Sequence, residues 1–261
     1  MANKESTVRT LTVAVLVCLV CSVFVAGAAV ALKPTQAENR QLDKQRSILA
    51  IAGLGEAGMS GKEVKALFAE RIRARVVDLD KGAFSDAQDA ASFDPLKAAK
   101  DPELSEALPA EQDIASIKRR EHFSTVYMVE KDGALETLIL PVRGYGLWST
   151  LYGFVAVKGD LNTVVGFGFY QHGETPGLGG EVDNPKWKAL WTGKTLFDEQ
   201  GQLAVEIIKG SVDPQSAKAT HQVDGLAGAT LTSKGVNNLL HFWLGENGFG
   251  PLLANLKKGE A

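Results

Sequence analysis

Cysteine is nearly missing from this 261-residue chain: Cys18 and Cys21 are its two cysteines, and both lie in one apolar N-terminal run. The remainder therefore lacks the thiols for a disulfide scaffold, a cysteine-ligated zinc site or an iron–sulfur cluster bound by this chain alone. Histidine is scarce as well, with 4 residues, none paired with another at the spacing of metal ligands. We accordingly predict no metal site and assign no catalytic residue.

An excess of positive charge is also lacking. The chain has 28 lysines and arginines against 31 aspartates and glutamates, a formal net charge of −3. We therefore expect no nucleic-acid partner. An apolar share of 45% and a charged share of 23% are typical of a folded globular protein. The length suffices for one sizeable domain or two small ones.

One long hydrophobic run is present, from Leu11 to Leu32, and it contains no charged residue. As a helix this run would be about 33 Å long, enough to cross a bilayer core of about 30 Å. Small-residue sites at 26–28 and 29–31 leave a cleaved signal peptide as the alternative. The run exceeds the usual signal-peptide core of about 7–15 residues, so we predict a tail at 1–10 and a retained transmembrane helix at 11–32. Basic residues flank both ends, so charge leaves the orientation open.

Residues 33–120 are predicted to hold membrane-proximal helices and a surface excursion. Residues 35–52 have the spacing of a helix, which the glycines of 53–61 end. Ser60 and Glu63 have the spacing of a capping box and predict a second helix. A strand is expected at 73–79, and the polar stretch 85–120 is expected to hold short helical pieces.

Residues 121–261 are predicted to form an α+β domain with an antiparallel sheet and flanking helices. Asp132-Gly133 between two apolar runs predicts a hairpin, and the turn at 159–162 predicts another. Strands are expected at 124–130, 134–142, 152–158, 164–170 and 202–208, and a helix at 231–244.

Glycine is concentrated in the middle of the chain, with ten residues from Gly144 to Gly180. The string GETPGLGG at 173–180 is denser in glycine than a hairpin requires, and such a loop lets backbone N–H groups approach a ligand closely. An ordinary glycine-rich surface loop is the alternative. His172 precedes this loop, and Glu181 and Asp183 follow it; we interpret the two acids as part of a solvated loop.

A second string, DGLAGATLTS at 224–233, places small residues and three hydroxyls where the last long helix is expected to begin. A helix N-terminus with free N–H groups is suited to a phosphate. The alternative is a helix capped by Ser or Thr, and we expect Thr232 and Ser233 to take that capping role.

Gly53 to Gly58 also match the pattern G-x-G-x-x-G, with Asp78 about twenty residues on. A dinucleotide fold would need a strand before this motif and a parallel sheet around it. A helix is expected there instead, and the later strands are expected to be antiparallel, so we do not predict a dinucleotide site.

The string DGLAGATLTS resembles the flavinylation motif of the FMN-binding domains in sodium-translocating NADH:quinone reductases and the related Rnf complexes. GLWSTLYGF at 146–154, GFGFYQHGETPGLGGEVDNPKWKALWTGK at 166–194 and the N-terminal run resemble the C subunit of the sodium-translocating reductases, so the resemblance covers essentially the whole chain. It implies that Thr230 carries FMN through a phosphoester bond. The motif usually has Ser or Thr where this chain has Ala227; that position does not receive the flavin, so we expect the modification to survive.

Further flavin contacts are predicted around Thr230. Gly228 and Ala229 leave room for the ring system, and a flavin also needs apolar walls and a few donors. Trp148 is expected to line the ring, with a core or interface tryptophan as the alternative. Lys209 is expected to place positive charge near the flavin, with a solvated lysine as the alternative. The predicted cofactor contacts are Thr230, Gly228, Ala229, Leu231, Glu174, Thr175, Gly177, Leu178, Trp148 and Lys209.

The resemblance implies a covalent-FMN electron carrier within a multi-subunit complex that passes electrons from NADH to quinone and exports Na⁺. It implies a single pass through the bacterial inner membrane, a periplasmic main domain, other membrane and soluble subunits as partners, and a flavin transferase for maturation. One alternative is the G subunit of an Rnf complex, although the 166–194 string favours the C subunit of the reductase. Another is a non-redox membrane-anchored binding module, in which 224–230 would merely lead into a helix.

Overall fold

The computed structural model describes residues 6–56 and 58–261, and the chain divides into two compact units at Asp43 and Lys44. Helix α1 (Thr7–Ile51) is continuous, so the predicted transmembrane helix and the helix expected at 35–52 form one element. Residues 6–41 are exposed, as expected for a lipid-facing run and its polar extension. In the described part of the chain, α1 is the one helix long and apolar enough to span a membrane.

The second unit is built around a six-stranded antiparallel sheet in the order β2-β1-β5-β6-β7-β8. The strands are β1 (Arg73–Asp78), β2 (Ala83–Phe84), β5 (Phe123–Lys131), β6 (Ala134–Tyr145), β7 (Thr150–Lys158) and β8 (Val164–Gln171). Asp132 and Gly133 have φ of 52° and 80° and close the predicted β5–β6 hairpin. The β7–β8 hairpin is confirmed too. Because every pairing in this sheet is antiparallel, a dinucleotide-binding fold is excluded.

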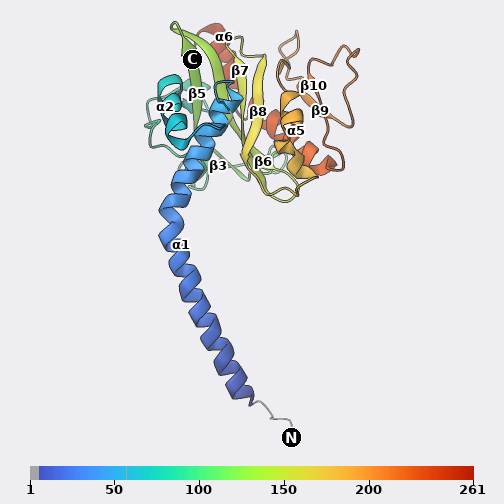
Figure 1. Ribbon diagram of the computed structural model, residues 1–261. Coiled ribbons are helices and arrows are strands. Elements are labelled where there is room, and N and C mark those ends of the chain that lie inside the picture. The colour runs from blue at the N-terminus through green and yellow to red at the C-terminus, as the bar shows by residue number, and fades with distance from the viewer. Residues whose placement is uncertain (1–5, 57) are drawn as a thin grey trace. The chain divides into compact units, whose positions relative to one another are not determined.

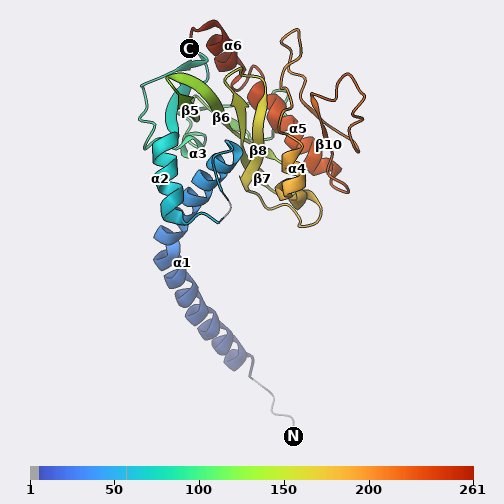
Figure 2. The ribbon, with the colours of Figure 1, turned by 45° about the horizontal axis from the view of Figure 1, so that its top comes forward.

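Helices cover both faces of the sheet (Figures 1 and 2). On one face lie the last turns of α1 and helix α2 (Gly61–Arg71), which the predicted Ser60–Glu63 capping box begins. Gly166 lets α1 approach closely, because a Cβ there would lie 2.5 Å from the Ile51 carbonyl oxygen. On the other face lie α5 (Thr230–Leu244) and α6 (Gly250–Lys258). Helix α6 has no counterpart among the predicted elements.

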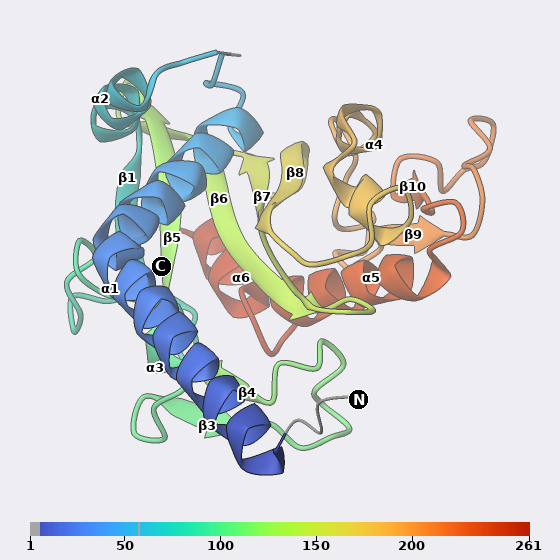
Figure 3. The ribbon, with the colours of Figure 1, turned by 60° about the horizontal axis from the view of Figure 1, so that its bottom comes forward.

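A short parallel pair, β9 (Glu206–Ile208) and β10 (Gln222–Asp224), lies beside α5 (Figure 3). The strand predicted at 202–208 is therefore wrong over its first half. Leu203 pairs with Phe197, and the N–H groups of Ala204 and Val205 donate to the Leu196 carbonyl, so this stretch folds back on the chain before it.

Aromatic side chains hold the glycine-rich loop region against the sheet. The 3₁₀ helix η1 (Gly179–Asp183) and helix α4 (Pro185–Ala189) follow that loop. Phe167 of β8 packs on Trp191 with ring centroids 4.4 Å apart. The indole Nε1 of Trp187 donates to the Asp224 carbonyl at 2.9 Å, which links α4 to β10. The loop at 173–180 is thus tethered at its far end to the strand that precedes α5.

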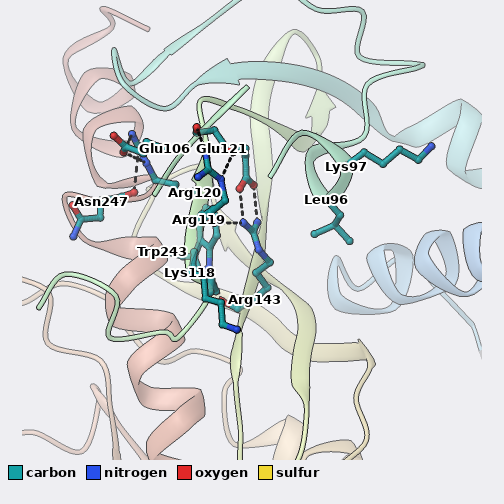
Figure 4. A network of polar contacts seen from close by, with 12 residues as sticks. Leu96, Lys97, Glu106, Lys118, Arg119, Arg120, Glu121, Arg143, Trp243 and Asn247 are labelled. Carbon is teal, nitrogen blue, oxygen red and sulfur yellow. Dashed lines mark hydrogen bonds and ion pairs between the residues drawn. The ribbon is translucent and has the colours of Figure 1, made fainter. Parts of the chain in front are cut away.

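The polar excursion contains the short helix α3 (Pro95–Ala98), as predicted, and also the strand pair β3 (Ser105–Ala107) and β4 (Arg119–Glu121), which was not. Buried charges fix this pair to the sheet (Figure 4). Arg143 of β6 donates to both carboxylate oxygens of Glu121 at 2.7 and 2.5 Å. Arg120 bonds Glu106 and Asp80 and reaches the Asn247 carbonyl beyond α5. The indole of Trp243 donates to the Arg143 carbonyl at 2.7 Å, so α5 joins the same network.

Candidate functional site

Thr230 is the first residue of α5, and its side chain is exposed. Gly228 before it has φ of +70°, a left-handed conformation that favours glycine. The N-cap residue is Ala229, so no side chain caps α5. The first N–H groups of a helix lack partners within the helix, and together with the helix dipole they attract an anion. The start of α5 therefore presents a free hydroxyl next to uncapped N–H groups.

The two other hydroxyls of the string are buried and do not cap the helix, which corrects the expectation for Thr232 and Ser233. Thr232 is 1% exposed and donates its hydroxyl to Glu174 at 2.7 Å. Ser233 is 8% exposed, and its Oγ accepts the Leu226 N–H at 3.0 Å. Both residues lie past the first helical position and use their hydroxyls for tertiary contacts. Of the three hydroxyls, Thr230 alone is open to an external reagent.

Glu174 connects the three segments around the start of α5. Its Oε1 accepts the N–H groups of Leu147, Trp148 and Ser149 at 3.2, 3.0 and 3.2 Å, and its Oε2 accepts the Thr232 hydroxyl. Burial alone would raise the pKa of the Glu174 carboxyl, but these donors together hold the pKa below its usual range. The carboxylate is thus charged and buried, and both of its oxygens accept hydrogen bonds from the protein.

Two glycines make room for this carboxylate. A Cβ on Gly146 would lie 2.7 Å from Oε1 of Glu174, and a Cβ on Gly179 would lie 2.7 Å from Oε2. Neither distance is compatible with a side chain, so the backbone at both positions approaches the carboxylate as only glycine can. Part of the glycine enrichment between 144 and 180 therefore serves the packing around Glu174.

Large apolar side chains are exposed around the start of α5. Trp148 is 66% exposed, Leu231 58% and Leu178 47%. Leu178 lies next to Gly228, because a Cβ on that glycine would be 3.3 Å from Leu178 Cδ2. Trp148 belongs to a loop whose backbone Glu174 holds in place. Exposed apolar side chains on a fixed loop are suited to stack against a flat aromatic ligand.

Thr175 and Gly177 form a turn in the glycine-rich loop. The Leu178 N–H donates to the Thr175 carbonyl at 3.1 Å, and Gly177 has φ of +75°, as a turn with Pro176 before the glycine requires. Both residues are exposed. Their backbone contacts shape the turn that carries Leu178 and do not join them to Thr230.

A cavity of about 200 Å³ adjoins Thr230 on the side of β9 and β10. Lys209, Lys234 and Thr230 are among its lining residues, so two basic residues and the exposed threonine border one cavity. A Cβ on Gly225 would lie 2.4 Å from the Ile208 carbonyl oxygen, and this close approach forms part of the lining. Sequence reasoning missed Lys234, although it lies four residues beyond Thr230 and therefore on the same face of the helix.

The donor set fits a flavin phosphate. Two lysines and the α5 N-terminus supply positive charge, and the cavity is the size of a phosphate and a short chain, while whole cofactors need about 300 Å³ or more. The ring system would therefore lie outside it, where Trp148, Leu178 and Leu231 are exposed. Among the described residues, no cluster of His, Cys, Asp and Glu could hold a metal ion.

Comparison with known proteins gives one consistent result. Residues 146–245 match the FMN-binding domain family. The chain is 83% identical over 261 residues to the C subunit of the Na(+)-translocating NADH-quinone reductase from Pseudomonas aeruginosa, covering 100% of both chains. It is 53% identical to the corresponding protein from Yersinia pestis, covering 98% of this chain and 96% of the relative. The fold is similar to the crystal structure of NqrC from Shewanella oneidensis, with a TM-score of 0.76, 38% identity and coverage of 85% and 99%.

Proposed function

Because this chain belongs to the family formed by the C subunit of Na(+)-translocating NADH-quinone reductases, we propose that it is the covalent-FMN electron carrier of such a complex, relaying electrons from NADH toward quinone. The chain has an FMN-binding domain, and it is an oxidoreductase subunit. Its sequence resembles no NADH site, no quinone site and no multi-helix sodium path. Those tasks, including sodium export, are assigned to partner subunits.

The exposure of Thr230 is the observation that supports its assignment as the flavin attachment point. Forming the phosphoester requires that the hydroxyl oxygen attack the phosphorus of a flavin nucleotide held by another protein. The bond from this phosphorus to a leaving phosphate group breaks, and the hydroxyl proton goes to that leaving group. Thr232 and Ser233 are buried and hydrogen-bonded, so a flavin transferase has no access to them. Thr230 is exposed at the start of α5 and lines the same cavity as Lys209 and Lys234, whose charges would balance that of the phosphodiester.

Different residues around Thr230 are proposed to contact the phosphate and the ring system of the cofactor. We assign the phosphate to the N–H groups at the start of α5, Lys209 and Lys234. We assign the ring to Trp148, Leu178 and Leu231. Glu174 acts through the backbone that it holds. When bound, FMN supplies the redox chemistry, and the attachment to the protein keeps the carrier from dissociating between redox states.

The surroundings of the protein follow from the same family. One apolar helix near the N-terminus supports a single-pass protein of the inner membrane. The family resemblance supports a periplasmic main domain, where a flavin transferase would modify Thr230. The partners are then the other subunits of the reductase and the lipid bilayer. Full-length identity to relatives that are C subunits of the reductase sets the Rnf G subunit aside.

Substitution of Thr230 tests this proposal. The full-length protein, expressed with a flavin transferase, should gain the mass of FMN less one water and remain fluorescent after denaturation. Thr230→Ala should lose at least nine-tenths of that fluorescence while staying folded, because an exposed hydroxyl contributes little to stability. Thr230→Ser, which keeps the hydroxyl, should retain the adduct.

Thr220→Ala is the matched control, since Thr220 is an exposed threonine that is not among the predicted cofactor contacts. It should keep the covalent flavin. Denatured Thr230→Ala protein that fluoresces as strongly as the unaltered protein would refute the attachment point. A colourless unaltered protein would refute the electron-carrier function and favour the non-redox binding module.

A further inference from the structure

His172 lies at the junction between β8 and the glycine-rich loop, and both of its ring nitrogens have partners. Nδ1 is 3.2 Å from the backbone nitrogen of Glu174, and Nε2 is 2.7 Å from Oδ2 of Asp183. The side chain is 13% exposed, so water has little access to it. Asp183 in turn bonds the Lys188 ammonium at 2.9 Å. The imidazole thus bridges the loop backbone and an ion pair.

The two partners determine where the ring carries its proton. A backbone N–H can only donate, so Nδ1 must be the acceptor and carry no proton. The Asp183 carboxylate can only accept while ionised, so Nε2 must carry the proton. Burial would raise the pKa of Asp183, but Lys188 and His172 hold it below its usual range, which keeps this acceptor ionised. A neutral ring with the proton on Nε2 satisfies both contacts.

The residue that His172 holds is the one that organises the candidate flavin site. Glu174 bonds the 147–149 backbone and Thr232 through its side chain. Thr232 is two residues beyond Thr230 on α5. A continuous series of hydrogen bonds therefore runs from Lys188 through Asp183, His172 and Glu174 to the start of α5.

We propose that His172 is a positioning residue of the flavin site, which in its neutral Nε2–H form fixes the Glu174 backbone and thereby the loop carrying Leu178 and the helix start carrying Thr230. The proposal rests on the proposed function. The charged groups that face the ring are Asp183 and Lys188, and the Glu174 carboxylate lies on the adjoining residue. Protonation of Nδ1 would set a donor against the Glu174 N–H and break the bond that positions the loop.

The tautomer can be measured without the flavin. Full-length protein labelled with ¹⁵N in histidine should give, for His172, an Nδ1 shift typical of an unprotonated nitrogen and an Nε2 shift typical of a protonated one. His172→Asn identifies these signals by their loss. The reverse assignment, or a doubly protonated ring at neutral pH, would overturn the proposal.

Two variants separate the contacts of the ring. In His172→Asn the amide oxygen lies near the position of Nδ1 and can still accept the Glu174 N–H. In His172→Gln the amide nitrogen lies near Nε2 and can reach Asp183, but nothing accepts that N–H. Hydrogen exchange at 173–180 should rise about tenfold in His172→Gln and stay within about threefold of the unaltered protein in His172→Asn.

The flavin provides the second readout. In flavinylated protein, His172→Gln should increase the quenching of flavin fluorescence by iodide, because the loop at 173–180 no longer shields the flavin ring system. His172→Asn should leave this quenching unchanged. Equal exchange and equal quenching in both variants would overturn the positioning role. The hydrogen-exchange and tautomer results can agree with expectation even if the protein never takes up flavin. That outcome would support the positioning of Glu174 by His172 and refute only the proposed function.

Discussion

Glu174 shows how much of a site can depend on one side chain that touches no ligand in our assignment. Its carboxylate binds the backbone of the 147–149 loop and the hydroxyl of Thr232 while being 5% exposed. A charged buried acceptor bonded by several donors is worth more than a neutral one. The segments that present Trp148, Leu178 and Thr230 therefore share one buried charge.

Glu174→Ala should destabilise the protein by about 3 kcal/mol, because it removes the acceptor of three half-buried backbone N–H groups and of the buried Thr232 hydroxyl. Glu174→Gln keeps one acceptor oxygen and should cost about 1 kcal/mol. Urea unfolding of the full-length protein in detergent, followed by tryptophan fluorescence, measures both. Equal losses in the two variants would contradict this account of the carboxylate.

The depressed pKa of Glu174 also predicts a pH dependence. The folded protein holds this group ionised below its ordinary pKa of 4.5, so the unfolded chain binds more protons in that range. The stabilisation is complete at neutral pH and is lost as the pH falls from about 5 toward the folded-state pKa. The urea midpoint should decline less steeply over this range in Glu174→Gln than in the unaltered protein. Equal declines in the two proteins would contradict the predicted role of the Glu174 carboxyl.

At the residue scale, the sequence predicted Thr230 through a motif and could not distinguish it chemically from Thr232 and Ser233. The distinction lies in burial, which depends on where Glu174 and Leu226 pack after folding. Glu174 was expected as a flavin contact, which stays a prediction, and the structure shows that its oxygens bond the 147–149 backbone and Thr232. Its role depends on contacts with residues that lie 25 or more positions away in the sequence, and no local sequence pattern encodes such contacts.

At the element scale, features with a local cause were predictable. The Asp132-Gly133 hairpin and the Ser60–Glu63 capping box were both confirmed. Strand β9 lies within the strand predicted at 202–208, but β10 and the β3–β4 pair were missed. Three-residue strands carry no periodicity, and the position of the β3–β4 pair is fixed by distant contacts such as Arg143 with Glu121.

Arg143→Met should destabilise the protein by about 3–5 kcal/mol, since it leaves Glu121, 1% exposed, without its cation. Replacing both partners, as Arg143→Met with Glu121→Leu, should recover part of that loss. Arg73→Met is the matched control, because Arg73 pairs with Glu130 at the surface and such pairs contribute about 0–1 kcal/mol. Urea unfolding ranks the three variants, and a double variant less stable than Arg143→Met would contradict this expectation.

At the scale of the whole molecule, the chain consists of two units with different surfaces. The unit up to Asp43 exposes its apolar side chains, including Leu11 at 61% and Phe24 at 74%. The unit from Lys44 has its own core, which begins at Ile48. Strand β1 pairs with β5 along its whole length, so the region from 73 onward shares one sheet with the residues after 121.

A chain that starts at Lys44 should fold in water without detergent and keep the stability of the full-length domain, because the core residues lie in the second unit. The full-length protein should need detergent or lipid, since a helix with this apolar surface is insoluble in water. Gel filtration and thermal unfolding test both statements. Aggregation of the shortened chain would show that the first unit contributes to folding.

The tip of the β5–β6 hairpin is a suitable labelling site for studying the protein within an assembled complex. Lys131, Asp132 and Gly133 are exposed, and a Cβ on Gly133 would meet nothing within 4 Å. Since Cys18 and Cys21 lie in the hydrophobic run, Lys131→Cys would introduce the one thiol outside that run. A spin label there could report the distance to an unpaired electron elsewhere in an assembled complex, without disturbing the backbone that surrounds Thr230.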